Sequence, residues 1–392
     1  MLAFLFLPAF IDNTPTLGIY AELREQYQDH QNPTFYGDSG KNFENLFSRL
    51  RVGLNYDSAA KIKARLEYQY AGSQTWAQAA NSTTESSDLL LGYIDYSTGG
   101  VTGIGGRQKI ELGQQRLIGS TEWLNLSRSF DAGRVESGQW DAWAGRLGVA
   151  NNKPETARIE ALSHTDKEWG TTTFIEKHDL GTVSGIDIQA LDHLAVHKFG
   201  KTTVDAEGVV EHGSSNGKDL RAWAWHLRAS QSILPKTTLR LEANAASGGG
   251  NATTTRTFDN LYPSNHDLYG LSDLVGWKNM NDFAIKLENH SFKSLTLSAE
   301  AHAFSLRDAS DGWYNAVGTV NAGPGGPFKD ATGASGRNLG SEYDLLASYN
   351  MKSCGTLMAG IAMFDPAGFQ QAVAGVGTSR LLYGFLQYGV RF

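Results

Sequence analysis

Apolar and polar residues alternate along much of this chain with a period of two, and the last twelve residues show the pattern clearly. In LLYGFLQYGVRF, Leu382, Leu386 and Val390 fall on one parity, whereas Gln387 and Arg391 fall on the other. Successive side chains of a β-strand point to opposite faces of a sheet, so this period predicts a strand with one apolar face. Because the strand reaches the last residue, we expect its end to be held by pairing with another strand.

Segments of the same kind recur along the chain. About eighteen can be counted, which is an even number, as expected of a closed antiparallel barrel. The alternation is least clear between residues 166 and 199, so about sixteen strands is the alternative. Tight turns such as DSAA, STGG, ILPK and SFKS alternate with long segments, including residues 247–279 and 307–341. The pattern predicts an all-β fold: a transmembrane antiparallel β-barrel with short periplasmic turns and long extracellular loops.

A soluble β-sandwich, propeller or solenoid would also contain alternating strands. However, no repeat of about 20–50 residues recurs, as a propeller or solenoid would require. The connections alternate in length, and the polar parity carries charge on strand after strand. These features favour the membrane barrel.

One domain accounts for most of the chain. We expect the barrel to occupy residues 16–392, preceded by a segment at residues 1–15 that opens with MLAFLFLPAF. This opening is apolar but lacks the basic region and the cleavage site of a signal peptide. A leader remnant, a cloning scar and a short segment inside the pore are all compatible with it.

Composition and charge narrow the class of protein further. Charged residues make up 19% of the chain, below the roughly 25% of soluble domains, and Gly, Tyr and Trp are frequent. No run of about 18 apolar residues could form a transmembrane helix. The net charge of −7, without a basic block, argues against nucleic-acid binding. The one cysteine, Cys354, cannot form an internal disulfide and has no metal-ligand spacing around it.

If the apolar parity faces lipid, the other parity lines a water-filled interior. In the first part of the chain this parity is rich in Arg and Lys, and a pore with rings of such residues favours anions. Acidic residues, among them Glu22, Glu67 and Glu136, lie between the basic ones. The competing interpretation is a ladder of cross-strand ion pairs that only holds the barrel in shape.

Signatures of catalysis, cofactors or metals are missing. GIGGRQ lacks the Lys-Ser/Thr of a nucleotide loop, and no Ser-His-acid set can be nominated. His193 and His197 would diverge as a pair of metal ligands. Trp223 and Trp225 share the apolar parity and are expected in an interfacial aromatic belt. The sequence therefore predicts a protein that is not an enzyme and has no cofactor.

Four ordered motifs resemble a known family. GGRQKIELGQQRLIGSTEWLNLSRSFDAGRV is followed by TFDNLYPSNHDLYGLSDLVGWKN, HAFSLRDASDGWYNA and NLGSEYDLLASYN, together spanning Gly105 to Asn350. They are similar to the alginate export family of bacterial outer-membrane β-barrel proteins. The resemblance implies an eighteen-stranded barrel that passes an anionic polysaccharide through an arginine-lined constriction. It transfers that role to Arg107, Arg116, Arg128, Asp131 and Arg134, although Arg116 falls in a loop and Asp131 on the opposite parity. The chain reads FDAG where the family usually reads FDG, and it is shorter than the alginate exporter.

We therefore predict a bacterial outer-membrane channel that conducts an anionic polysaccharide, anionic oligosaccharides or small anions. The alternatives are a general or small-solute diffusion porin without glycan specificity and a loop-plugged surface barrel that does not conduct. The expected partners are the anionic glycan or solute, outer-membrane lipid and, as a further candidate, periplasmic export components. The long Gly-rich loops are expected to fold inward or to cover the mouth. The residues predicted to line the pore and set its selectivity are Arg24, Arg49, Arg51, Lys63, Arg65, Arg107, Lys109, Arg116, Arg128, Asp131, Arg134, Arg146 and Arg240.

Overall fold

The alternating segments of the chain form long β-strands in a computed structural model. It describes residues 15–35, 42–58, 61–77, 81–148, 156–179, 185–323, 325–375, 377 and 379–392. The apolar opening, residues 1–10, lies outside these ranges, so the predictions made for it are not tested. No described helix has the length and hydropathy needed to cross a membrane.

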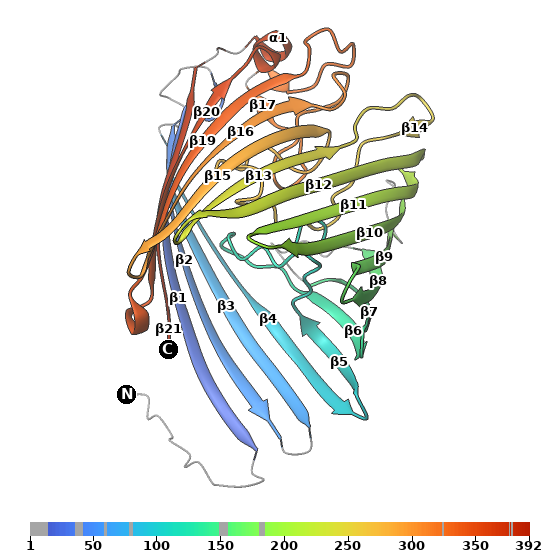
Figure 1. Ribbon diagram of the computed structural model, residues 1–392, viewed down its shortest axis with the longest axis vertical. Helices are drawn as coiled ribbons and strands as arrows, with labels where there is room; N and C mark the ends of the chain where they lie inside the picture. The colour runs from blue at the N-terminus through green and yellow to red at the C-terminus, as the bar shows by residue number, and fades with distance from the viewer. Residues whose placement is uncertain are drawn as a thin grey trace.

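Nineteen strands of the described residues share one sheet. One of them, β14 (Thr254–Thr255), lies within a loop and pairs in parallel with β12, and the other eighteen form an antiparallel wall (Figure 1). The wall strands are β1 (Thr16–Gln31), β2 (Phe43–Asp57), β3 (Ile62–Ala77), β4 (Ser82–Thr98), β5 (Val101–Gln108), β6 (Phe130–Ser137), β7 (Trp140–Leu147), β8 (Ala157–Asp166), β9 (Gly170–Asp179), β10 (Ile186–Phe199), β11 (Thr202–Ser215), β12 (Lys218–Leu234), β13 (Thr237–Ala246), β15 (Met280–Phe292), β16 (Leu295–Leu306), β19 (Asn338–Asn350), β20 (Thr356–Pro366) and β21 (Leu381–Arg391).

The wall closes on itself between its first and last strands. β1 pairs with β2 on one side and with β21 on the other. Beyond the end of β21, Phe392 N donates to Ala21 O at 2.8 Å, and Ala21 N donates to Phe392 O at 3.3 Å. The pairing expected for the final segment is confirmed, and so is the count of eighteen, because β9 and β10 occupy the stretch where the alternation was unclear.

The direction of the side chains is the one predicted from parity. On β2, Leu50 and Val52 are 42% and 44% exposed, whereas Arg49 and Arg51 are only 5% and 2% exposed. A lipid-facing band needs apolar side chains outside, so charged residues collect inside. On β2, the predicted inward direction of the charged parity is thus confirmed.

Connections on the two ends of the barrel differ in length. At one end, the fully described turns comprise residues 99–100, 138–139, 167–169, 200–201, 235–236, 293–294 and 351–355. Long connections lie at the other end, although residues 216–217 between β11 and β12 form a tight turn there. By the general rule for outer-membrane barrels, the end with short turns is periplasmic.

Three long connections pass into the interior: residues 109–129, 247–279 and 307–337 (Figure 1). The latter two contribute Trp277, Trp313 and other large side chains that are fully buried. A short two-stranded sheet, β17 (Ala322–Gly323) and β18 (Gly326–Pro327), lies in the third connection. Two short helices lie in the described part of the chain, η2 (Lys352–Cys354) and α1 (Phe369–Ala374). The two long Gly-rich loops were expected to fold inward or to cover the mouth, and the buried Trp277 and Trp313 show that they fold inward.

Candidate functional site

Residues 109–129 form a loop that crosses the barrel interior, and we call it the bridging loop. It leaves the wall after β5 and rejoins it at β6. One part of the loop contacts β1 and β2, and another part contacts β11, β12 and β13. The bridging loop therefore joins two regions of the wall that are far apart in the sequence.

On the β1–β2 side, arginines of the wall hold the backbone of the bridging loop. Arg24 donates to the carbonyl oxygens of Glu122 at 2.8 Å, Trp123 at 2.9 Å and Leu124 at 3.1 Å. Arg49 donates to the carbonyl oxygens of Glu122 at 2.9 Å and Leu124 at 3.3 Å. A guanidinium has five N–H donors in a fixed fork, which suits it to several acceptors at once. The loop backbone supplies these acceptors halfway along the two strands.

The carboxylate of Glu122 strengthens the same attachment. It lies 2.8 Å from Arg51 and 3.6 Å from Arg49, and it pairs with Lys109. Burial raises the pKa of Glu122, but Arg51, Lys109 and Arg49 lower it further, so the pKa falls from 4.5 to about 2. Glu122 therefore stays ionised at any physiological pH.

Most of the positive charge in this group is compensated. The group comprises Arg24, Arg49, Arg51 and Lys109 with Glu22, Glu67 and Glu122, four cations against three carboxylates. Among the described residues, Arg24 donates to carbonyl oxygens and to one amide oxygen, that of Asn125. The wall arginines thus act first as anchors of the bridging loop, with a net charge of +1 left over.

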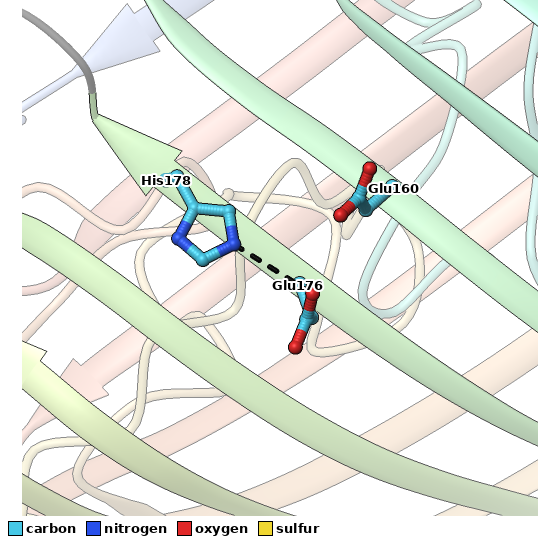
Figure 2. Close-up of side chains that lie close together, drawn as sticks. All are labelled: Glu160, Glu176 and His178. Carbon is cyan, nitrogen blue, oxygen red and sulfur yellow. Dashed lines mark ion pairs between the residues drawn. The ribbon is translucent and has the colours of Figure 1, made fainter.

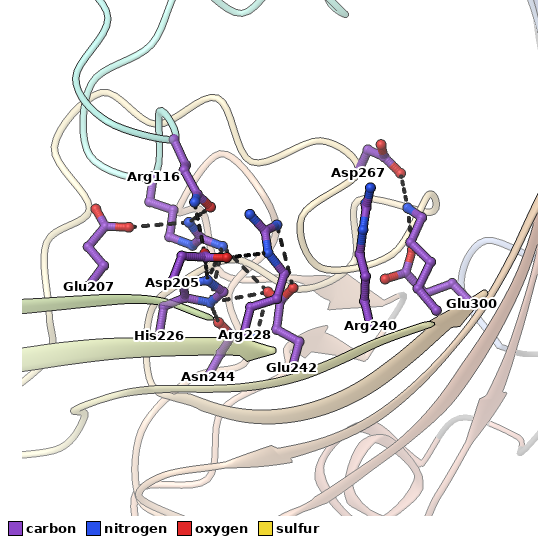
Figure 3. A network of polar contacts seen from close by, with 12 residues as sticks. Arg116, Asp205, Glu207, His226, Arg228, Arg240, Glu242, Asn244, Asp267 and Glu300 are labelled. Atoms are coloured by element: carbon purple, nitrogen blue, oxygen red, sulfur yellow. Dashed lines mark hydrogen bonds and ion pairs between the residues drawn. The ribbon is translucent and has the colours of Figure 1, made fainter. Parts of the chain in front are cut away.

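On the opposite side, Arg116 of the bridging loop enters an acidic part of the wall (Figure 3). Its side chain has no exposed surface and lies 3.2 Å from Glu207 of β11 and 3.4 Å from Glu242 of β13. It also contacts His226 of β12 at 3.1 Å and lies over the ring of Trp277, 6.0 Å from its centroid. A buried cation requires such compensation, because burial without partners is very costly.

The acidic part of the wall is itself connected. His226 lies 2.8 Å from Asp205 and 2.6 Å from Asn244, and Arg228 donates to Asp205 at 2.9 Å (Figure 3). Gln114 of the bridging loop donates to Asp205 at 2.8 Å as well. The basic wall at β1–β2 and the acidic wall at β11–β13 therefore bind complementary parts of one loop.

The bridging loop also pairs with the connection of residues 247–279. Tyr262 N donates to Leu117 O at 2.8 Å, and Gly119 N donates to Tyr262 O at 3.0 Å, as in a parallel bridge. The rings of Trp123 and His266 stack with centroids 3.8 Å apart. The two connections are thus packed as one unit inside the barrel.

The structure brings together only some of the residues predicted to line the pore. Arg24, Arg49, Arg51, Lys109, Arg116 and Arg128 contact side chains or backbone of the inward-folded loops. Others pair along the wall instead: Arg65 with Asp57 at 3.2 Å, Arg134 with Asp141 at 2.8 Å, and Arg240 with Glu288 at 3.0 Å. Lys63 is exposed near the periplasmic end of β3.

The prediction that Arg107 has the inner parity of β5 is wrong. Arg107 is the cross-strand partner of Asp131, and the two form a bidentate pair at 2.7 and 3.0 Å. Both have the parity of the exposed Val101, whereas their neighbours Gln108 and Phe130 are the buried pair. Asp131 does lie on the opposite parity, as predicted, so the prediction that it lines the pore is wrong together with that for Arg107. The glycines of this strand carry no side chains, so alternation gave no guide to its faces.

Arg146 shares this outer parity, which corrects its predicted inner placement. It is the cross-strand partner of both Asp131 and Arg158. Next to Arg158, the same face of β8 and β9 carries Glu160, Glu176 and His178 (Figure 2). Each of these three offers a ligand atom within 4.8 Å of the others, but side chains of this kind are common on exposed faces.

Sequence reasoning missed the part played by Glu122, Trp123 and His226. Glu122 and Trp123 lie in the STEWLNL stretch of the first family motif, so the motif was a signal for a special role. Alternation could not assign that role, because these two residues lie in a loop. The partners of His226 come from β11, β13 and the bridging loop.

Comparison with known proteins now identifies the fold and the family. The sequence model of the family described as "Alginate export" matches residues 16–383. The chain belongs to the alginate export family. Among curated proteins, no match is found.

Solved structures of Pseudomonas aeruginosa outer-membrane proteins share the fold at low sequence identity. OccK5 (OpdH) has a TM-score of 0.62 at 11% identity, with 96% of this chain and 98% of that chain covered. The outer membrane protein OprD has a TM-score of 0.62 at 11% identity, with 96% and 93% covered. OccK2 (OpdF) in complex with glucuronate has a TM-score of 0.61 at 11% identity, with 96% of both chains covered. This member of the alginate export family is thus a β-barrel channel of the bacterial outer membrane, and it is not an enzyme.

Proposed function

We propose that this channel passes anionic carbohydrates, as a polysaccharide, as oligosaccharides or as small anions. The observation that carries the proposal is a cavity of about 420 Å³ at the periplasmic end, below the bridging loop. Among the described residues, its lining includes Arg24, Arg49, Lys352 and Arg391 and one acidic side chain, Glu22, which gives a net charge of +3. Low-dielectric walls focus such a field onto the permeating ion and raise its local concentration.

The cavity differs from the anchoring group described above because two of its cations hold no part of the bridging loop. Lys352 lies in the turn between β19 and β20, and Arg391 lies over the ring of Tyr20 at 4.2 Å. These cations can therefore attract a carboxylate without releasing the loop. A uronate sugar, such as the glucuronate named in the OccK2 structure, has the matching charge.

A second candidate function, a barrel whose lumen is plugged, is favoured by a specific observation. Large side chains of the inward-folded connections, including Tyr269, Trp277 and Trp313, are fully buried. The bridging loop also crosses the interior from one wall to the other. A barrel of this kind would hold ligand at the mouth and conduct nothing.

Liposome swelling distinguishes these functions. Liposomes that contain the full chain are placed in glucuronate or in glucose, a neutral sugar of similar size, and the swelling rates are compared. We expect faster swelling in glucuronate. Equal rates would favour a general diffusion porin, and no swelling with either sugar would favour the plugged barrel. Periplasmic export components remain proposed partners on family membership alone.

A further inference from the structure

A second polar cluster lies on the inner face of β15, β16 and β19, and Asn244 links it to the acidic wall that receives Arg116. It contains four carboxylates, one histidine and one lysine: Asp282, Glu300, Glu342, Asp344, His302 and Lys286. Glu300 and Asp344 are direct cross-strand partners, as are His302 and Glu342. With a neutral histidine, the cluster carries a net charge of −3. Such an excess in a buried place calls for a cation or for protons.

Three of these side chains converge. Glu300, His302 and Asp344 each offer one ligand atom, and these atoms lie within 4.8 Å of one another. His302 and Asp344 are only 3% and 4% exposed. Even so, among the described residues Asp344 Oδ1 has no hydrogen-bond partner, and His302 Nε2 makes no hydrogen bond but lies 3.5 Å from Glu300 Oε1. Buried polar atoms are rarely left without a hydrogen bond, so Asp344 Oδ1 and the loosely paired His302 Nε2 point to a missing ligand.

The surroundings hold each of the three side chains by its other polar atom, and for Asp344 this atom is Oδ2, which accepts from Leu271 N at 3.3 Å. His302 Nδ1 lies 3.1 Å from Asp282, which in turn accepts from Asn244 at 2.9 Å. A carboxylate at Nδ1 fixes the tautomer that leaves the Nε2 lone pair free, as in many metal-bound histidines. The second oxygen of Glu300 lies 2.7 Å from Lys286 Nζ.

We propose that Glu300, His302 and Asp344 bind one divalent cation of the zinc class, with Asp282 orienting the histidine. One imidazole and two carboxylates suit zinc better than calcium or magnesium, which prefer oxygen ligands throughout. Glu300 is the partly exposed ligand, 11% by its side chain, and it provides the path of entry from the lumen. The inference does not depend on which solute the channel passes.

The cation would strengthen the contacts that hold the connection of residues 247–279 against the wall. Leu271 N donates to Asp344 at 3.3 Å, and Ser272 N donates to the adjacent Glu342 at 2.9 Å. Asp267 lies 3.5 Å from Lys286. Because these loop contacts fall on the ligands or their neighbours, neutralising the carboxylates would stabilise this loop against the wall.

Calorimetric titration with Zn²⁺ tests the proposal on the full chain, refolded in detergent and stripped with a chelator. We expect one Zn²⁺ per chain, and an affinity about 10- to 100-fold lower in Asp282→Asn, which changes only the residue behind the histidine. Glu300→Gln and Asp344→Asn keep the side-chain shapes and should abolish binding. The matched control is Glu160→Gln with Glu176→Gln on the outer face, which should bind as the wild type does.

Two results would overturn the proposal. One is the absence of any Zn²⁺ binding by the folded wild-type chain, which would mean that protons satisfy the cluster. The other is binding that survives Asp344→Asn and disappears in the outer-face control. If the variants fail to fold, the wild type alone still tests the site. Zn²⁺ should raise the unfolding temperature of the wild type, and an unchanged unfolding temperature would also reject the site.

Discussion

Arg24 of β1 and Arg49 of β2 are direct cross-strand partners, and both donate to the carbonyl oxygen of Glu122. Two like charges placed opposite each other in a sheet repel. Here the repulsion is offset, because the backbone of the bridging loop lies between the two guanidinium groups and accepts from both. The arrangement makes wall and loop depend on each other, and several predictions derive from it.

Replacement of Arg24 should loosen the bridging loop. In the wild type, the guanidinium of Arg24 donates to the carbonyl oxygens of Glu122, Trp123 and Leu124. Arg24→Ala removes this shared donor. We expect single-channel conductance in planar bilayers to rise and to become noisier. Arg65→Ala is the matched control, since Arg65 pairs with Asp57 of the wall and should leave the conductance nearly unchanged. Equal effects of both variants would contradict an anchoring role.

Loss of Arg116 should destabilise the whole barrel. Arg116→Met leaves Glu207 buried without its cation and takes one cation away from Glu242, which costs about 3–5 kcal/mol for a buried pair. The unfolding free energy in urea measures this cost. Arg240→Met, which breaks the more exposed pair with Glu288, should cost only about 0–1 kcal/mol. Similar losses in the two variants would argue against the buried network.

Acid should release the bridging loop only at very low pH. The pKa of Glu122 is lowered from 4.5 to about 2, since the cations around it outweigh its burial. A carboxylate with a lowered folded-state pKa contributes stability that is fully present above 4.5 and is lost as the pH falls through about 2. The pH dependence of conductance should therefore show its loop-release step below 4.5. Glu122→Gln should remove that step, and a midpoint above 4.5 in the wild type would refute the assignment.

Charge at the periplasmic cavity should set the ion selectivity. Lys352→Gln together with Arg391→Gln lowers the charge of the lining from +3 to +1 without touching the anchors of the bridging loop. We expect the reversal potential in a salt gradient to shift away from anion selectivity. Lys198→Gln with Lys201→Gln removes two exposed charges near another turn at the same end and serves as the control. An unchanged reversal potential in the cavity variant would contradict the proposed role of this lining.

Sequence alone determined the barrel, its strand count and, on strands with strong alternation, its inner face. The period of two places Leu50 outside and Arg51 inside β2, because lipid accepts only apolar side chains over a wide band. On β5 the same reasoning failed for Arg107. Gly103, Gly105 and Gly106 precede it and carry no side chains, so the two faces of the strand cannot be told apart there.

Only the tertiary structure decided what the inner charges do. The alternation identified Arg24, Arg49 and Arg51 as inward residues, but it treated them as free pore charges. Their partners come from the bridging loop, and Arg24 and its partner Leu124 are separated by 100 residues along the chain. Sequence spacing carries no information about such long-range contacts. The acidic wall that receives Arg116 is likewise assembled from three strands, β11, β12 and β13. Local alternation fixes the face on which a charge lies, whereas its compensation depends on which distant groups the folded chain brings within reach.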